Sequence, residues 1–453
     1  MKQKEAQLIH ETSLKILEEI GVKLEHDEVF ERVINAGARA GSDAQVVTFP
    51  REMVEEHLKM APSEVALDDR QGTGATLSCD CESVFWTNPG LNIREGDEVR
   101  EISRADLADI ARLCDHLPGV HGVMGMAMAD VTPRHRDFTG VRVIAENTRK
   151  HIRALCFTPQ GMEALLEMKQ VFPGNWLSIG FTAHGPLRWT NLALGIFLKS
   201  AGAGIPATVN GEPMAGVSGP VSLAGSAAVG NAEILSGIVI NQVLEPGRPV
   251  IHNLGLAHAF DMKDAAAITG GPENAMLAVI GAEMGRFYNL PSSSWISTES
   301  VYDDCQASLE KMFGIHTHTI NKVSLIWGLG QLESEKTISL AQLVLDDEMI
   351  AYARHYNRGA AVTPETINYD LIREVGIGGS YLESEDTLFN YREHLWVPNI
   401  LNRKAREACD LPLEQVAHAK ARGILDGDNE EKIDAGELAE LRKIEEKYAA
   451  LIS

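Results

Sequence analysis

Short runs of β-forming apolar residues alternate with helical patterns along most of this chain, from Ser103 to about residue 357. Seven such runs stand at residues 120–129, 152–157, 176–181, 205–210, 249–255, 292–297 and 323–329. Continuous apolar strands separated by helices are typical of a parallel sheet that is covered on both faces. Because seven units in sequence fit a closed barrel better than an open sheet, the pattern predicts an α/β fold built on a (βα)8 barrel.

The eighth strand and the ends of the chain are less strongly marked. Residues 85–88 or 377–381 could supply the missing strand. Residues 1–102 mix helical patterns with short strand-like pieces, which predicts an N-terminal α+β cap. Residues 103–403 form the expected barrel domain, which opens at the capping-box-like Ser103-Arg104-Ala105-Asp106. Residues 404–453 are polar and helical, and we expect a C-terminal helical extension that packs on the barrel or on a second subunit.

The charge balance limits the possible partners. The chain carries 64 acidic and 41 basic residues, a net charge of −23, and such a field repels nucleic acid and anionic membrane surfaces. We find no secretion signal at the N-terminus and no long uncharged apolar stretch, so no membrane span is expected. The six cysteines are scattered, which suits reduced thiols, and a cytoplasmic location is predicted.

Several separated segments form distinctive motifs. They are residues 218–230 (Ser-Gly-Pro-Val-Ser-Leu-Ala-Gly-Ser-Ala-Ala-Val-Gly), 245–252 (Glu-Pro-Gly-Arg-Pro-Val-Ile-His), 291–297 (Pro-Ser-Ser-Ser-Trp-Ile-Ser), 313–318 (Phe-Gly-Ile-His-Thr-His) and 327–333 (Trp-Gly-Leu-Gly-Gln-Leu-Glu). Together these segments resemble the trimethylamine methyltransferase family. The opening helix, residues 12–21, is also typical of the family. The resemblance covers nearly the whole chain.

This resemblance implies a TIM barrel, an amine methyl donor, and a corrinoid (cobalamin) acceptor that is carried by a separate partner protein. The founding members contain pyrrolysine, whereas this sequence has only the twenty standard residues. It therefore resembles the non-pyrrolysine branch, whose substrates are quaternary amines. Glycine betaine is our first choice, and proline betaine, carnitine and γ-butyrobetaine stay open. We also expect a homo-oligomer.

Quaternary amine chemistry makes few demands on side chains. The nitrogen is already cationic, so the amine leaves as a neutral molecule, and the protein has only to position donor and acceptor. We therefore expect no catalytic side chain and no bound metal. His316 and His318 could bind zinc with a remote cysteine such as Cys305, but no companion spacing supports such a site. A metal-dependent TIM-barrel hydrolase, which would need a cluster of His, Asp and Glu residues at strand ends, is a weaker alternative, as is a non-catalytic betaine-binding protein.

Candidate binding residues stand near the predicted carboxyl ends of strands, where barrel sites lie. Aromatic faces attract quaternary ammonium groups, which favours Trp295, Trp327 and Phe181, although packing in the core is the common fate of such rings. The polar candidates for the substrate are His184, Asn210, Glu212, His252, Asn253, His316, His318 and Glu333.

Overall fold

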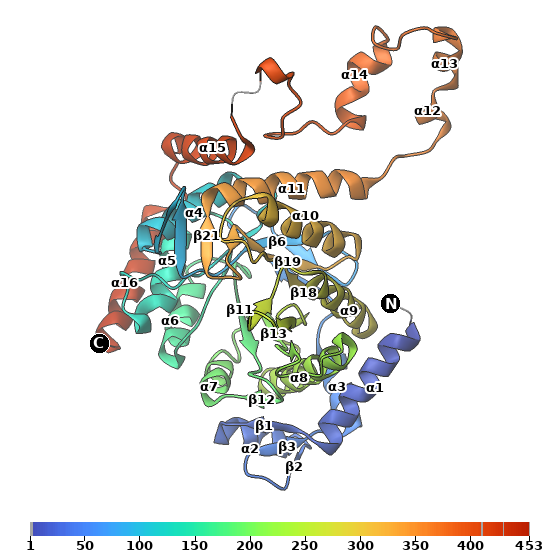
Figure 1. The fold of residues 1–453 in the computed structure, drawn as a ribbon. Helices are drawn as coiled ribbons and strands as arrows, with labels where there is room; N and C mark the ends of the chain where they lie inside the picture. Colours follow the sequence, from blue (N-terminus) through green and yellow to red (C-terminus); the bar gives the residue numbers. More distant parts are fainter. Residues whose placement is uncertain (1–2, 409–410, 429, 453) are drawn as a thin grey trace.

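The protein is described by a computed structural model that covers residues 3–408, 411–428 and 430–452 (Figure 1). Eight parallel strands close into a barrel. In chain order they are β6 (Val84–Thr87), β9 (Gly122–Met124), β10 (His151–Arg153), β11 (Leu177–Thr182), β13 (Ala207–Asn210), β15 (Val250–Asn253), β18 (Ser292–Trp295) and β19 (Leu325–Leu329). Each of the seven predicted runs overlaps one of these strands, so the (βα)8 prediction is confirmed.

The eighth strand is β6, one of the two segments that the sequence offered. The other segment, residues 377–381, is not a strand. Strand β6 pairs with β19 and β9 and thereby closes the barrel. It lies within residues 1–102, so the barrel takes its first strand from the segment that was expected to form the cap.

One long helix follows each barrel strand and packs outside it. These helices are α4 (Arg104–His116), α5 (Arg136–Asn147), α6 (Pro159–Lys169), α7 (Asn191–Lys199), α8 (Leu223–Leu244), α9 (Pro272–Tyr288), α10 (Cys305–Ile320) and α11 (Leu340–Arg358), with a 3-10 turn at Pro133–His135 before α5. The predicted capping box opens α4: the Ser103 hydroxyl accepts from the Asp106 N–H, and the Asp106 carboxylate accepts from the Ser103 N–H at 2.8 Å.

Two small sheets grow out of the loops at the carboxyl ends of the strands. One sheet contains β7 (Asn92–Glu95), β8 (Glu98–Glu101), β20 (Gln331–Leu332) and β21 (Thr337–Ser339); the other contains β14 (Met214–Ala215), β16 (His258–Asp261) and β17 (Ala266–Ile268). They follow β6, β13, β15 and β19. The mouth of the barrel is therefore bordered by hydrogen-bonded strands rather than by long irregular loops.

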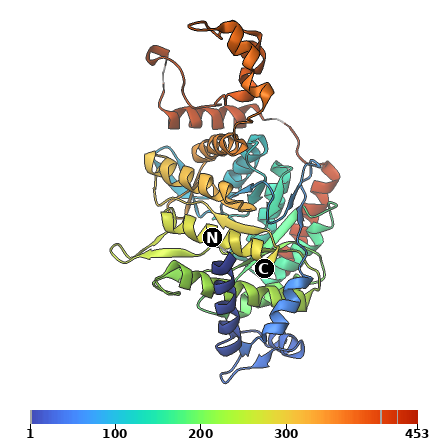
Figure 2. The same ribbon diagram turned by 90° about the vertical axis from the view of Figure 1, so that its right-hand side faces the viewer.

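The N-terminal region forms a cap on one side of the barrel (Figures 1 and 2). Its elements are α1 (Gln3–Glu19), β1 (Val22–Leu24), α2 (Asp27–Asn35), β2 (Arg39–Ala40), β3 (Val46–Thr48) and α3 (Arg51–Met60), and β12 (Arg188–Trp189) joins its sheet. The hairpin of β4 (Val65–Leu67) and β5 (Ala75–Leu77) precedes the barrel, and its Leu67 and Leu77 pack in one cluster with Trp86.

Helix α8 lies between the cap and the barrel. It is long and apolar enough to cross a membrane, but 78% of its most apolar 18-residue stretch is buried inside the protein. It packs against α1, α3 and β13. The Ser13 hydroxyl of α1 donates to the Ala228 carbonyl of α8 at 3.0 Å, and the Asn231 side chain donates to Ser13 at 2.9 Å. These contacts are those of a central core helix.

The C-terminal helices pack on the barrel of their own chain, one of the two expected arrangements. Helix α15 (Leu413–Gly427) contacts α11 and α4, and α16 (Ala435–Leu451) contacts α5 and α6. Between α11 and α15 the chain extends away from the body as an arm, residues 359–401, which carries α12 (Pro364–Ile367), α13 (Tyr369–Val375) and α14 (Glu385–His394) (Figures 1 and 2). A short 3-10 turn, Arg406–Ala408, follows.

Candidate active site

A cavity of about 140 Å³ lies at the carboxyl ends of the barrel strands. Its walls come from seven of the eight strands or from the loops that follow them. The lining residues are Trp86, Pro89, Met124, Arg153, Leu155, Thr182, Thr208, Asn210, Asn253, Leu256, Trp327 and Glu335. The cavity can hold a small molecule but not a corrinoid, which would have to act from outside the mouth.

Larger hollows occur elsewhere on the protein. One of about 610 Å³ lies near the amino ends of the strands, beside Ser83 and Lys322, and one of about 680 Å³ is a groove on α10 and α11. Active sites of (βα)8 barrels lie at the carboxyl ends of the strands. We therefore take the smaller cavity as the candidate active site.

Tryptophan rings form one wall of this cavity. Trp327 of β19 and Trp86 of β6 both line it. Trp295 of β18 packs against Trp327 with ring centroids 5.2 Å apart but does not line the cavity itself. The side-chain oxygen of Asn274 accepts from the indole N–H of Trp295 at 2.8 Å when the amide is oriented so that its nitrogen donates to the Trp295 carbonyl. Trp295 thus supports the wall from behind.

Two carboxyl groups lie at the mouth. Burial raises the pKa of Glu212 and of Glu335 to about 7 in each case, and the charge of Glu212 adds to the rise at Glu335. Both groups therefore lose their protons less readily than ordinary glutamates, and a cation in the cavity would favour their ionised forms. A third carboxyl, that of Glu233 on α8, accepts from the N–H groups of Leu187 and Glu212, and burial raises its pKa to about 7 as well.

A buried ion pair fixes the backbone of the loop that carries Glu335. Glu335 has a φ of +87°, in the left-handed region. The buried Lys311 ammonium pairs with the Asp346 carboxylate at 2.7 Å and donates to the carbonyls of Gly328 and Gln331. This pair fixes the chain where it leaves β19, and thereby the loop that carries Glu335.

Arg153 brings a positive charge to the opposite part of the cavity. Its side chain is only 7% exposed, and burial lowers the pKa of the guanidinium to about 10. It donates to the Ala154 carbonyl and, at 3.4 Å, to the Thr208 hydroxyl. Within the described part of the chain no carboxylate pairs with it. A buried charge without a counter-ion costs several kcal/mol, and an anionic ligand would relieve that cost.

Gly180 makes the space for this guanidinium. A Cβ atom at Gly180 would overlap both the guanidinium of Arg153 and the hydroxyl of Thr208. The position of Arg153 therefore depends on the lack of a side chain on the neighbouring strand.

Neutral polar groups complete the lining. The Asn253 amide donates to the Asn210 side-chain oxygen at 2.8 Å, and the Asn210 amide donates to the Thr182 hydroxyl at 2.9 Å. This chain of hydrogen bonds joins β15, β13 and β11 across the cavity, so it fixes the orientation of both amides.

The structure thus brings Trp327, Asn210 and Asn253 together in the cavity, with Glu212 beside it. Two other candidates point away from it. Phe181 stacks on Phe197 of α7 with ring centroids 3.7 Å apart, and the His252 ring bonds Asn231 of α8 at 2.9 Å. Both face the helix layer, because neighbouring residues of a strand point to opposite sides.

The remaining candidates also lie outside the cavity. His184 is exposed in the turn between β11 and β12. The Glu333 carboxylate accepts from the Thr337 hydroxyl at 2.8 Å, and it is Glu335, two residues on, that reaches the cavity. His316 and His318 stand on α10 and not at a strand end. His318 is buried against Ser294 and the Trp295 carbonyl, and burial lowers its pKa to about 4, while His316 lies in the surface groove.

Sequence reasoning missed Arg153, Trp86 and Glu335. Arg153 did carry a signal, since it is the charged residue within the apolar run at residues 152–157. Trp86 falls within the strand candidate at residues 85–88. Glu335 has no signal of its own, because only the fold of its loop brings it to the mouth.

The residues that the structure describes do not supply the ligands of a metal centre. Across residues 3–408, 411–428 and 430–452, no three His, Cys, Asp or Glu side chains are grouped so that they could hold a metal ion. His316, His318 and Cys305, the possible zinc ligands in the sequence, lie along one outer helix.

Comparisons with known proteins agree with this geometry. The sequence profile of trimethylamine methyltransferases matches residues 1–451. The chain is 29% identical to a trimethylamine methyltransferase of Desulfitobacterium hafniense, over 97% of this chain and 92% of that one. It is 28% identical to the glycine betaine methyltransferase of D. hafniense strain Y51, over 93% and 91% of the two chains.

Among solved structures, the monomethylamine methyltransferase of Methanosarcina barkeri superposes with a TM-score of 0.55 at 12% identity, over 93% of this chain and 86% of that one. At this identity the likeness concerns the fold. With the family profile matching nearly every residue, the chain belongs to the trimethylamine methyltransferase family.

Proposed function

We propose that this enzyme moves a methyl group from a carboxylated quaternary amine, with glycine betaine as first choice and dimethylglycine as product, to the Co(I) corrinoid of a cytoplasmic partner protein. The observation that carries the proposal is the unpaired, buried guanidinium of Arg153 in the same small cavity as Trp86, Trp327 and Glu335. Such a cavity presents one positive side and one aromatic, acidic side, which is the charge pattern complementary to a betaine.

The aromatic and acidic side suits a quaternary ammonium group. Such a group has no N–H to donate, so it gains most from ring faces and nearby negative charge. Trp327 and Trp86 supply the rings, at roughly 0.5–2 kcal/mol for each desolvated contact, and Glu335 supplies the charge.

The positive side suits a carboxylate. Arginine binds carboxylates through two parallel hydrogen bonds, and such charge-assisted bonds are about twice as strong as neutral ones. The hydroxyl of Thr208 and the amides of Asn210 and Asn253 stand close by for further hydrogen bonds. Tetramethylammonium has no group for this side of the cavity, and choline offers a neutral hydroxyl in place of a carboxylate.

The small volume of the cavity ranks the candidate donors. Glycine betaine, proline betaine, carnitine and γ-butyrobetaine all pair an ammonium with a carboxylate. The cavity measures about 140 Å³, which favours the donor with the shortest spacing between the two charges. The name of the relative from D. hafniense, a glycine betaine methyltransferase, supports the same choice.

The residues then act by binding and orientation. A Co(I) corrinoid presented at the mouth supplies the nucleophile that accepts the methyl group. The aromatic wall and Arg153 hold the donor so that one N–methyl bond can face the mouth. Because the departing amine is neutral, no side chain has to donate a proton.

The mouth also fits a docked acceptor. Large apolar side chains are exposed on the loops that follow β13, β15 and β18, namely Val217, Val221, Met262 and Tyr302. An apolar rim around a polar cavity is the expected surface for the ring and protein that carry the acceptor.

A panel of donors tests the proposal. The protein is incubated with Co(I) corrinoid and glycine betaine, choline, tetramethylammonium or proline betaine, and the loss of the Co(I) absorption band is followed together with dimethylglycine formation. We expect glycine betaine to give the highest kcat/KM. Equal rates with tetramethylammonium would show that Arg153 does not read a carboxylate, and no transfer from any quaternary amine would refute the reaction itself.

A further inference from the structure

The arm, residues 359–401, leaves the end of α11 and returns to the middle of the same helix (Figures 1 and 2). At its return the Glu348 carboxylate accepts from the N–H groups of Asn399 and Ile400 at 2.9 and 3.2 Å. The Tyr352 and Trp396 rings meet edge to face, 4.9 Å apart. Both ends of the arm are therefore anchored on α11.

The helices of the arm have no core of their own. Helices α12, α13 and α14 contain no buried residue. The large apolar side chains of the arm face solvent instead: Phe389 of α14 is 72% exposed and Leu382, between α13 and α14, is 80% exposed. Tyr369, Leu388 and Leu395 are also exposed. Short helices without an apolar partner are unstable in water, so a helical arm of this composition needs a cover.

A second uncovered apolar surface lies next to the base of the arm. The groove of about 680 Å³ on α10 and α11 is lined mainly by apolar side chains. Leu309 at its edge is 72% exposed, and Phe313 and Tyr352 are partly exposed. Leu401, at the return of the arm, fills only one end of this groove.

We propose that two copies of this chain exchange arms, so that the arm of each copy lies in the α10–α11 groove of the other. A two-fold axis beside the arm base brings the same two surfaces of both copies together, because residue i then meets residue j while j meets i. Each copy offers one uncovered arm and one uncovered groove on the same side of the molecule, so a single symmetric contact covers all four surfaces.

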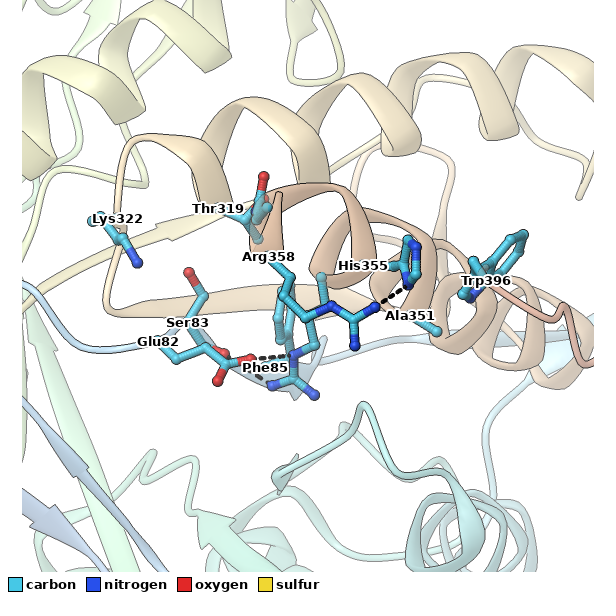
Figure 3. A pocket seen from close by; sticks show the side chains of 11 residues that line it. Glu82, Ser83, Phe85, Thr319, Lys322, Ala351, His355, Arg358 and Trp396 are labelled. Atoms are coloured by element: carbon cyan, nitrogen blue, oxygen red, sulfur yellow. Dashed lines mark hydrogen bonds and ion pairs between the residues drawn. The ribbon is translucent and has the colours of Figure 1, made fainter. Parts of the chain in front are cut away.

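The placement of the arm base argues for a second copy and against the corrinoid-carrying partner. Figure 3 shows Trp396 of the arm and Arg358 of α11 around the same pocket as Ser83, which precedes β6, and Lys322, which precedes β19. This pocket lies at the amino ends of the strands. An acceptor protein has to reach the cavity at the carboxyl ends, on the opposite side of the barrel.

The size of the arm also fits a stable contact. Specific interfaces bury about 800 Å² and about 20–30 residues on each partner. The arm, residues 359–401, is longer than that and can supply enough residues, and the groove provides the apolar centre that such interfaces have.

Mass measurement on the full chain tests the arrangement. Wild-type protein, a Leu388→Asp/Phe389→Asp arm variant, a Leu309→Asp groove variant and a Leu192→Asp control are compared by light scattering and sedimentation. Leu192 is 51% exposed on α7, away from both surfaces. We expect the wild type and the control to have the mass of at least two chains, and the arm and groove variants to fall to one chain with an unchanged circular dichroism spectrum.

A second measurement avoids any loss of fold in the variants. A mixture of ¹⁴N- and ¹⁵N-labelled wild-type chains is cross-linked through carboxyl groups, and links from Glu385 or Asp386 to α10 or α11 are sought by mass spectrometry. Links that join the two labels support the exchange. A single-chain mass for the wild type, or links confined to one label, would overturn the proposal. Arm links that form only to the corrinoid-carrying protein, once that protein is added, would overturn it as well. None of these results depends on which amine is the substrate.

Discussion

Replacing Arg153 with methionine removes the buried guanidinium while it keeps a long side chain in the cavity. If Arg153 binds the substrate carboxylate, the loss should appear only with carboxylated donors. Truncating one partner of a buried charge pair costs about 2–5 kcal/mol. Since about 1.4 kcal/mol is a factor of ten, we expect kcat/KM for glycine betaine to fall by roughly 30- to 4,000-fold, and kcat/KM for tetramethylammonium to change little.

The same substitution should not destabilise the fold. The pKa of Arg153 is lowered from 12.5 to about 10, so the unfolded chain holds this proton more tightly than the folded one. The charged guanidinium therefore destabilises the folded protein at any pH below about 10, by about 3 kcal/mol at neutral pH. Methionine removes this cost and loses the hydrogen bonds to Ala154 and Thr208, so we expect the melting temperature of the variant to be equal or higher.

The assay follows the loss of the Co(I) absorption at varied donor concentration, with the melting temperature measured on the same samples. Gly180→Ala is the matched second variant, since its Cβ would displace the guanidinium without touching the charge. It should show the same selective loss for glycine betaine. Equal losses with both donors, or a melting temperature well below that of the wild type, would identify Arg153 as a structural residue and refute the reasoning.

Four further predictions concern the ammonium side and the chemistry. Trp327→Ala should raise the KM of every quaternary amine by about tenfold for each 1.4 kcal/mol of lost cation–π attraction. Trp295→Ala should mainly lower the melting temperature. Both effects are measured by steady-state kinetics and thermal unfolding, and an unchanged KM in Trp327→Ala would contradict the assignment. Burial raises the pKa of Glu335 and Glu212 to about 7, so the neutral carboxyls favour the folded protein at low pH, whereas a bound cation favours the ionised carboxylates. The KM of the quaternary amine should therefore fall as pH rises from 6 to 8. A Glu335→Gln variant whose KM depends on pH as steeply as that of the wild type would count against the assignment. Purified active protein should contain no stoichiometric metal by plasma mass spectrometry, and one zinc per chain that activity requires would revive the hydrolase alternative. Dimethylglycine and trimethylamine should not be demethylated, because an unprotonated tertiary amine would have to leave as an amide anion. Product analysis that shows rates like that of glycine betaine would refute this prediction and would point to a proton donor in the cavity, such as the carboxyl of Glu335.

The barrel could be predicted from the sequence because each inner strand is a short apolar run between helical patterns. The eighth strand was ambiguous because β6, Val84–Thr87, stands among other short strand-like pieces. The arm could not be predicted, since its helical patterns resemble those of the barrel helices. Only the three-dimensional contacts separate helices that pack from helices that do not.

The site was predictable only in part, and for a geometric reason. The sequence places a residue near a strand end but leaves open which way it points. Asn253 faces the cavity and its neighbour His252 faces α8, and Thr182 and Phe181 divide in the same way. If the predicted strand is shifted by one residue, a side chain assigned to the cavity instead packs in the core, and the reverse. Arg153 escaped notice because a single charge within an apolar run is usually a strand end and not a buried binding group.

The seating of α1 on α8 has a consequence for how the chain is made. The Ser13 hydroxyl finds its acceptor, the Ala228 carbonyl, 215 residues further along the chain. Bacterial and eukaryotic ribosomes add about 5–20 residues per second, so roughly 10–40 s pass between the synthesis of these two positions. Through that interval α1 can pack on β3 and α3 of the cap, but its contacts with α8 cannot form. The contacts of α1 are thus completed long after the helix itself has been synthesised.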